Sequence, residues 1–116
     1  MFKELKIRDI KLPLLANGAT PYHFKRLFGK DLLKQLTSTG EYEIASDEIP
    51  ELAFIMAMQA EKADMAQLTF EKYIEWLEQF DALDMVMKST EIADVYIGNT
   101  IPKEKPKKKA SGKANA

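Results

Sequence analysis

Few side chains in this sequence could carry out a reaction. The chain has one histidine, His23, and no cysteine. A general base or an activated nucleophile would therefore have to involve His23. His23 falls in the first turn of a predicted helix, where a histidine usually lies on the surface or caps the helix. We therefore expect His23 to be structural and not catalytic.

Carboxylates are the other candidate groups. Glu71, Glu75 and Glu78 could bind Mg²⁺ or act as an acid–base pair. At helical spacing beside a polar face, however, they are typical of a solvated surface. The five glycines are isolated, so neither a dinucleotide-binding motif nor a phosphate-binding loop is present, and no metal motif is found. The sequence predicts no cofactor and no enzymatic activity.

The length of 116 residues allows one domain. Hydrophobic residues make up 46% and charged residues 30%, which is typical of a folded globular chain. The N-terminus has no apolar signal segment, and the longest apolar run, residues 52–58, is far shorter than the ~20 residues that span a bilayer. We expect a cytoplasmic protein without a membrane partner.

The net charge of −1 hides three blocks of opposite sign. Residues 1–40 carry a net charge of +5, residues 41–100 carry −11, and residues 101–116 carry +5. Complementary patches of this kind steer association and set its orientation, so the pattern suits head-to-tail self-association or an extended partner. Pairing of the basic and acidic helices within one monomer explains it equally well.

Residues 101–116 differ from the rest of the chain in composition. The segment IPKEKPKKKASGKANA has one large apolar residue, so we expect a disordered basic tail after a folded domain of residues 1–100. Its six lysines could attract nucleic acid through phosphates. Because the folded part is acidic and no helix carries the residues that read base edges, we expect no specific nucleic-acid partner.

The folded part is predicted to be mainly α, a small four-helix domain with a short N-terminal β element. Rough alternation in residues 1–18 indicates one or two short strands turning near Arg8 and Asp9, with Pro13 confining the second to an edge. The spacing of apolar residues predicts helices over residues 20–37, 46–63, 69–80 and 81–98.

Each predicted helix has a recognisable start signal. The expected capping residues are Thr20 with Pro21 behind it, Ser46 or Asp47, Thr69, and Asp81. Gly29 marks a kink, a close approach or a break of the first helix into two shorter helices, and Gly98 should lie just past the end of the fourth.

The first two predicted helices differ in how charged and apolar residues are distributed around them. Arg26, Lys30 and Lys34 form a basic stripe opposite the apolar face of the first helix. The second helix is apolar almost all round, so it must be central in the core or cover a second surface.

The third and fourth helices should each bury an apolar face. In the third helix, Phe70, Tyr73, Ile74, Leu77 and Phe80 should face inward. In the fourth helix, the spacing predicts as inward-facing residues Leu83, Val86, Met87, Ala93 and Ile97.

Methionines and aromatic residues provide the most informative pattern. Helical stripes of such residues usually form core, but methionines two positions apart, as in Met56 and Met58 or Met85 and Met87, cannot share one helix face. Some should therefore be exposed, where flexible thioethers suit a groove for apolar helices. The predicted partner-binding residues are Phe54, Met56, Met58, Trp76, Phe80 and Met85.

Three phrases and the chain's end carry a resemblance to a known family. They are ATPYHFKRLFGKDLLKQL at residues 19–36, IPELAFIMAMQAEKAD at 49–64, FEKYIEWLEQFDALD at 70–84, and the Lys/Pro-rich end. Together they resemble the tail assembly chaperones of long-tailed bacteriophages and prophages, most of all those of Gram-positive hosts. The resemblance covers roughly residues 5–100.

The resemblance implies a nonenzymatic role in the host bacterial cytoplasm. Such chaperones coat the aggregation-prone tape measure protein and bring tail tube subunits to it, and they are absent from the mature virion. They are commonly made as a short form and as a form extended by programmed frameshifting. This chain would be the short form, which engages the tape measure protein, while the extension engages the tail tube protein.

One hypothesis for the assembly and two alternative functions follow from the same residues. Several copies would line the tape measure protein, with Arg26, Lys30 and Lys34 of one copy meeting the acidic helix over residues 69–80 of the next. The main alternative is a permanent virion component, such as a head–tail connector or a tail-completion protein. The second alternative is a small helical regulator that binds nucleic acid through its lysine tail.

Overall fold

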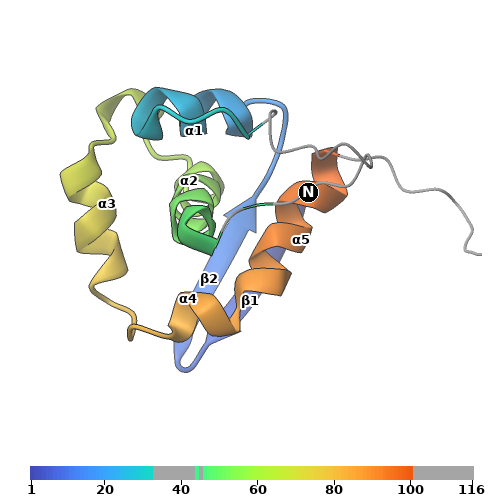
Figure 1. Cartoon of the computed structure of the whole chain (residues 1–116), viewed down its shortest axis with the longest axis vertical. Coiled ribbons are helices and arrows are strands. Elements are labelled where there is room, and N and C mark those ends of the chain that lie inside the picture. Colours follow the sequence, from blue (N-terminus) through green and yellow to red (C-terminus); the bar gives the residue numbers. More distant parts are fainter. Residues whose placement is uncertain (33–43, 45, 101–116) are drawn as a thin grey trace, which may run out of the picture.

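The computed structural model describes residues 1–32, 44 and 46–100. This part of the chain is mostly helical, with a two-stranded antiparallel sheet at the N-terminus. Helix α2 (Ile49–Ala60) lies in the middle, with other helices and the hairpin arranged around it (Figure 1). The predicted tail, residues 101–116, and the end of the first predicted helix beyond residue 32 lie outside the described residues.

The N-terminal β element is a hairpin, as the alternating pattern predicted. Strand β1 (Phe2–Ile7) pairs with β2 (Ile10–Leu15), and Leu5 lies opposite Leu12 in the register. The turn consists of Arg8 and Asp9, and Arg8 has a φ of 55°, in the positive region that two-residue hairpin turns require.

Leucine and isoleucine side chains alternate toward the buried face of the hairpin. The buried residues of the two strands are Leu5, Ile7, Leu12 and Leu14. This face packs on α2, so the hairpin forms one wall of the core (Figure 1). Pro13 lies in the edge strand β2, as expected.

The first helix, α1 (Thr20–Phe28), is shorter than the predicted 20–37. It ends because Gly29 adopts a left-handed conformation with a φ of 73°, and the Gly29 N–H donates to the carbonyl oxygen of Lys25. A continuous helix to residue 37 is therefore wrong. Most of the second, shorter helix that a break would produce lies outside the described residues. Pro21 lies in the first turn, as expected.

Thr20 does not cap α1. The N-cap is Ala19, which makes no side-chain capping bond. The buried Thr20 hydroxyl instead donates to Gln59 Oε1 at 2.7 Å and accepts from the Asn17 N–H at 2.9 Å. The predicted cap is therefore wrong, because the hydroxyl joins the entry of α1 to the central helix.

The central helix α2 follows a short 3₁₀ turn, η2 (Ser46–Glu48). Its N-cap is Glu48 without a side-chain capping bond, so the predicted caps Ser46 and Asp47 are wrong, while Pro50 lies in the first turn as expected. All residues from Leu52 to Ala57 are buried. A helix that is apolar all round therefore takes the central place in the core, one of the two possibilities that the pattern allowed.

Helix α3 (Phe70–Leu77) lies within the predicted range and follows a 3₁₀ turn, η3 (Met65–Gln67). Thr69 is its N-cap, and the Thr69 hydroxyl accepts from the Lys72 N–H at 3.2 Å, which confirms that prediction. Tyr73 is buried against Phe28 and Phe54, with ring centroids 5.0 and 5.4 Å away. These aromatic contacts attach α3 to the core.

The predicted fourth helix is two helices, α4 (Asp84–Met87) and α5 (Ser89–Thr100), so the described residues form five α-helices and not four. Asp81 is not a cap; its N–H donates to Asp84 Oδ2 at 2.8 Å. Gly98 lies inside α5 and not past its end. The boundary at Lys88 lets α4 and α5 run in different directions (Figure 1).

Candidate partner-binding surface

Half of the predicted partner-binding residues lie inside the protein. Phe54, Met56 and Met85 are buried. Placing them on a partner surface is therefore wrong, because α2 is surrounded on all sides and Met85 points into the same core. Met58, Trp76 and Phe80 are half-buried at the edge of the core.

Trp76 and Phe80 form an aromatic row that continues from the core toward the surface. The ring centroids of Trp76 and Phe54 are 5.4 Å apart, and those of Trp76 and Phe80 are 5.1 Å apart in an edge-on arrangement. The main contacts of Trp76 and Phe80 are to the protein itself, which leaves a partner only their outer edges.

The largest exposed apolar side chains after the α3 helix lie on α4. Leu83, Val86 and Met87 are 66%, 62% and 76% exposed, and their spacing of three and four positions places them on one helix face. We call these three residues the α4 ridge. The predicted inward orientation of these residues is wrong, because Met85 takes the inward position. Leu83 and Met87, two positions from Met85, point nearly opposite to it, and Val86 points sideways and out.

The exposed methionine follows the rule for methionines two positions apart. Met85 is buried and Met87 is exposed, so this pair does not share a face, as predicted. What the sequence did not indicate is which member of the pair faces solvent. That depends on how α4 is held against the rest of the molecule.

A second apolar strip lies on α3. Phe70 and Ile74 are exposed one helical turn apart, so the prediction that they face inward is wrong. Together with Glu71 and Glu75 they line an open, shallow groove, and Glu78 is exposed on the same helix. We call these five residues the α3 face. It combines two apolar side chains with three carboxylates, so it favours a partner that carries apolar and basic groups together.

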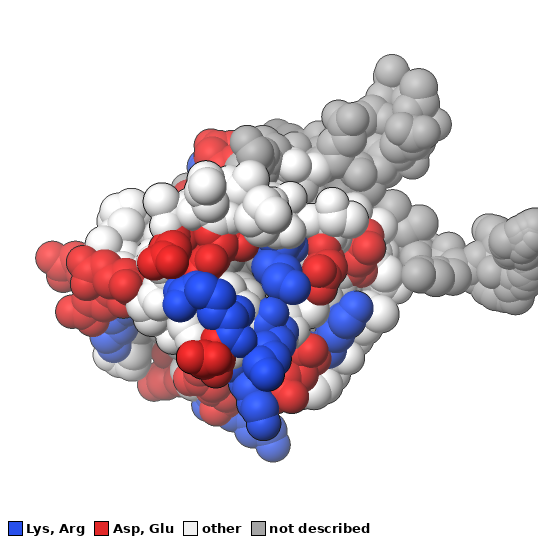
Figure 2. Space-filling model, turned by 90° about the horizontal axis from the view of Figure 1, so that it is seen from below, with Lys and Arg blue, Asp and Glu red and all other residues white. Residues whose placement is uncertain are grey.

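Charge is unevenly spread over the end of the molecule that holds the hairpin turn and α4. Figure 2 shows lysine and arginine side chains in a band across this end, with a cluster of aspartate and glutamate side chains beside it. The hairpin supplies exposed Lys3, Lys6 and Lys11. Basic and acidic surfaces therefore lie side by side in one monomer.

The predicted basic stripe for self-association does not exist as one helical face. Lys30 follows the break at Gly29, and its Nζ lies 2.9 Å from Glu51 Oε1 and 3.8 Å from Asp47 Oδ2. The hydrogen bond to Glu51 raises the pKa of Lys30. Lys30 is thus paired within its own chain, and Lys34 lies outside the described residues. The self-association contact stays a prediction for Arg26 alone.

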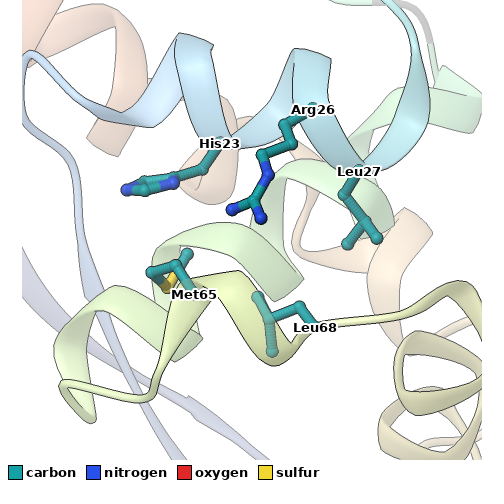
Figure 3. Close-up of a pocket in the computed structure, with 5 residues that line it drawn as sticks. All are labelled: His23, Arg26, Leu27, Met65 and Leu68. Atoms are coloured by element: carbon teal, nitrogen blue, oxygen red, sulfur yellow. The ribbon is translucent and has the colours of Figure 1, made fainter.

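Arg26 and His23 point from α1 toward the η3 turn (Figure 3). Arg26 is exposed, and His23 is half-buried. Burial, and then the nearby Arg26 charge, lower the pKa of His23. His23 therefore favours the neutral form at neutral pH. No carboxylate lines the cavity beside it.

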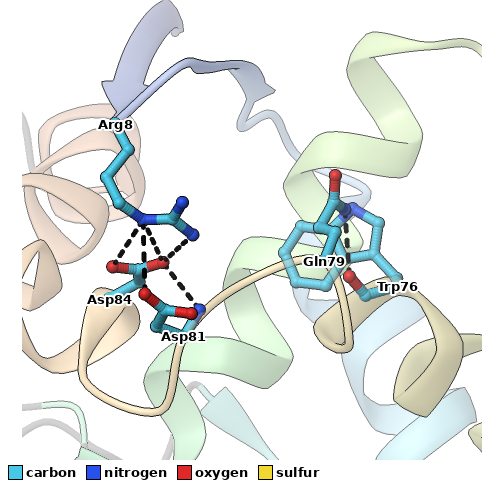
Figure 4. A network of polar contacts seen from close by, with 5 residues as sticks. All are labelled: Arg8, Trp76, Gln79, Asp81 and Asp84. Carbon is cyan, nitrogen blue, oxygen red and sulfur yellow. Dashed lines mark hydrogen bonds and ion pairs between the residues drawn. The ribbon is translucent and has the colours of Figure 1, made fainter.

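An ion-pair network fixes the turn between α3 and α4. Arg8 Nε and Nη2 donate to Asp84 Oδ2 at 3.2 and 2.8 Å, and Asp81 lies 3.7 Å from Arg8 Nε (Figure 4). The Arg8 hydrogen bonds lower the pKa of Asp84. On the α3 side, Gln79 Nε2 donates to the Trp76 carbonyl oxygen at 2.9 Å. The α4 ridge is thereby held in a set orientation beside the hairpin turn.

No other site of a recognisable kind is found in the described ranges. Within them, no group of three or more His, Cys, Asp or Glu side chains is placed to hold a metal ion. None of the helices described has the length and apolar composition needed to cross a membrane. Comparison of the chain with protein-family models, curated proteins and solved structures gave no match.

Proposed function

We propose that the chain is a nonenzymatic tail assembly chaperone that binds and solubilises the tape measure protein of a long-tailed phage. It would help to recruit tail tube subunits, mainly through a longer frameshifted form, and would act in the host cytoplasm without entering the mature virion. Two things support this proposal. They are the sequence resemblance and two exposed surfaces, the apolar α4 ridge and the α3 face.

The α4 ridge is the observation that carries the proposal. Three large apolar side chains exposed on one face of a short helix leave apolar area that a partner can cover. Complete burial of one such side chain stabilises by about 1.5–3 kcal/mol before the costs of association. One copy therefore binds weakly. A long client with repeated apolar stripes would be covered by several copies, whose combined binding is much tighter.

The α3 face adds selectivity to this contact. Glu71 and Glu75 lie together along one side of the apolar pair Phe70 and Ile74. A client helix with lysine or arginine beside its apolar stripe would gain from these carboxylates, whereas an acidic helix would be repelled.

Co-expression with the tape measure and tail tube proteins of the same phage tests the proposal. We expect the tagged chain to keep the tape measure protein soluble and to co-purify with it. The double variant Leu83→Ser, Met87→Ser removes two of the three ridge side chains. It should therefore recover less than about a tenth of the soluble tape measure protein that the wild type recovers. Tyr22→Ser is the control, since Tyr22 is also a large exposed hydrophobic residue, 71% exposed, but lies on the different helix α1.

The outcomes separate the alternatives. If the wild-type chain leaves the tape measure protein insoluble and binds nothing, the chaperone proposal is wrong, and presence of the chain in purified particles would then support a permanent virion component. If the wild type succeeds and the ridge variant succeeds equally, the chaperone role stands and the α4 ridge is not its surface. Circular dichroism of each variant checks that it is folded.

A further inference from the structure

A small cavity opens between α1 and the η3 turn, at the end of the molecule away from α4 (Figures 1 and 3). His23, Arg26 and Leu27 of α1 line one wall, and Met65 and Leu68 line the other. Its volume is about 100 Å³. A single water needs roughly 10–15 Å³ by the same measure, so the cavity has room for an aliphatic side chain.

The floor of the cavity is apolar. Leu27, Met65 and Leu68 are each half-buried, and all three pack against the edge of the core. Their exposed surfaces face one another across the cavity. An aliphatic side chain placed there would cover apolar surface on both walls, and the flexible thioether of Met65 could adapt to its shape.

Arg26 makes the rim of the cavity cationic, and no described carboxylate lines it. The Arg26 side chain makes no hydrogen bond or ion pair with any described residue. Figure 3 shows the Arg26 guanidinium and the His23 imidazole directed into the same space above Met65. A carboxylate at this rim could accept hydrogen bonds from Arg26 and from His23, and no protein carboxylate occupies that position in the lining.

We propose that this cavity is a peptide-binding site for an acidic partner segment, which inserts one aliphatic side chain between Leu27, Met65 and Leu68. An Asp or Glu next to that side chain binds Arg26 and His23 at the rim. The apolar floor provides the anchor, and the cationic rim selects for acidic neighbours.

The chemistry of this site is opposite to that of the α3 face. The α3 face presents carboxylates beside apolar residues, whereas the cavity presents the Arg26 guanidinium and the His23 imidazole above an apolar floor. The cavity and the α4 ridge also lie toward opposite ends of the molecule (Figure 1). One copy therefore presents surfaces that favour partners of opposite charge. The peptide site does not depend on the proposed chaperone function.

His23 provides a clean probe because it is the only histidine in the chain. The imidazole resonances of the full chain are followed by NMR during titration with the peptide acetyl-Ala-Glu-Leu-Asp-Ala-amide. A neutral counterpart has Gln and Asn in place of the two acids, and a third peptide has Ala in place of Leu. We expect the acidic leucine peptide to bind with a dissociation constant on the order of 1 mM and to raise the pKa of His23. The other two peptides should bind at least about fivefold more weakly.

Two variants separate the rim from general charge. Arg26→Gln keeps the length of the side chain and should weaken binding of the acidic leucine peptide about fivefold to tenfold. Lys25→Gln removes one positive charge from the neighbouring exposed position, which does not line the cavity, and should bind like the wild type. Unchanged thermal midpoints show that both variants are folded.

Several results would overturn the peptide site. Equal binding of the acidic and neutral peptides would show that the rim does not select acidic residues. Equal binding of the leucine and alanine peptides would show that the apolar floor does not bind the aliphatic side chain. Equal losses of peptide affinity in Arg26→Gln and Lys25→Gln would show that only the net charge of the protein attracts the peptide. If the His23 resonances shift with protein concentration in the absence of any peptide, the cavity binds a second copy of the chain instead. None of these results depends on the tape measure protein, so the two proposals fail separately.

Discussion

Arg8 in the hairpin turn donates two hydrogen bonds to Asp84 at the start of α4, across 76 positions of sequence. The same Asp84 Oδ2 accepts the N–H of Asp81 at 2.8 Å. One carboxylate therefore ties together the hairpin turn, the loop after α3 and the first turn of α4. The exposed direction of Leu83, Val86 and Met87 depends on this arrangement.

Replacing Arg8 with glutamine should loosen α4 without unfolding the protein. The variant Arg8→Gln loses the ion pair, so we expect a lower thermal midpoint at pH 7 and sharper, more mobile methyl signals from Met87 in NMR. Lys11→Gln, which removes a charge from an exposed position of β2, is the control and should change neither. Unchanged Met87 signals in Arg8→Gln would show that the ion pair does not hold the ridge.

The contribution of this ion pair should depend on pH with a definite sign. The pKa of Asp84 is lowered in the folded protein, so the contribution is present above the ordinary carboxyl pKa of about 4 and is lost as pH falls through the lowered value. The difference in thermal midpoint between wild type and Arg8→Gln should therefore be constant from pH 5 to 8 and shrink below about pH 4. A difference that persists undiminished at pH 2 would contradict this account.

The buried hydroxyl of Thr20 should matter more than its position at a helix start suggests. Thr20→Val keeps the shape of the side chain but leaves Gln59 Oε1 and the Asn17 N–H without a partner, so the free energy of unfolding should fall by about 1–3 kcal/mol. Thr90→Val, at an exposed position of α5, should stay within about 0.5 kcal/mol of the wild type. Urea denaturation measures the free energy of unfolding of both variants. Equal losses would mean that the hydrogen bonds of Thr20 with Gln59 and Asn17 do not stabilise the fold.

Local chemistry explains why some elements could be predicted from the sequence. The hairpin follows from alternation on either side of Arg8 and Asp9, and the start of α3 follows from one threonine whose hydroxyl accepts an N–H three residues away. Met85 and Met87 were expected on different faces because helix geometry alone decides that. In each case the controlling contacts lie within a few residues.

Long-range contacts explain the errors. The Arg8–Asp84 hydrogen bond accompanies the split between α4 and α5 and the exposure of the α4 ridge. The spacing of apolar residues in this segment gives no sign of that bond. The burial of Phe54 and Met56 depends on the hairpin packing on α2. An apolar face can be predicted from its sequence, but whether a partner or the protein itself covers it depends on distant residues.

The predicted binding residues Phe54, Met56 and Met85 are buried for the same reason. The α4 ridge, which is exposed instead, is harder to recognise from the sequence. The pattern of the α4 ridge, with Leu83, Val86 and Met87 three and four positions apart, looks like a core face until Met85 is seen to occupy the inward position. The cavity beside His23 has almost no signal, since Met65 and Leu68 come from a 3₁₀ turn far from α1 in sequence.

Gly29 is the residue whose conformation ends α1, and its replacement should show this directly. Gly29→Ala should cost about 1–2 kcal/mol in the free energy of unfolding, because alanine disfavours a φ of 73° although no atom lies near the added methyl group. Gly18→Ala is the matched control, since it also has open space around it but no positive φ. Equal effects in the two variants would show that the left-handed conformation carries no cost.

The pair of Lys30 and Glu51 distinguishes an internal contact from a contact between copies. Glu51→Gln should lower the free energy of unfolding by about 0.5–1 kcal/mol, because Lys30 loses its partner at 2.9 Å. The pKa of Lys30 is raised, so this contribution is complete below the ordinary lysine pKa of about 10.4 and is lost as pH rises through the raised value. Sedimentation at low salt should be the same for Glu51→Gln and the wild type if the pair acts only within one chain. A variant with unchanged stability and weaker self-association would instead place Lys30 at a contact between copies, as the charge pattern of the sequence first suggested.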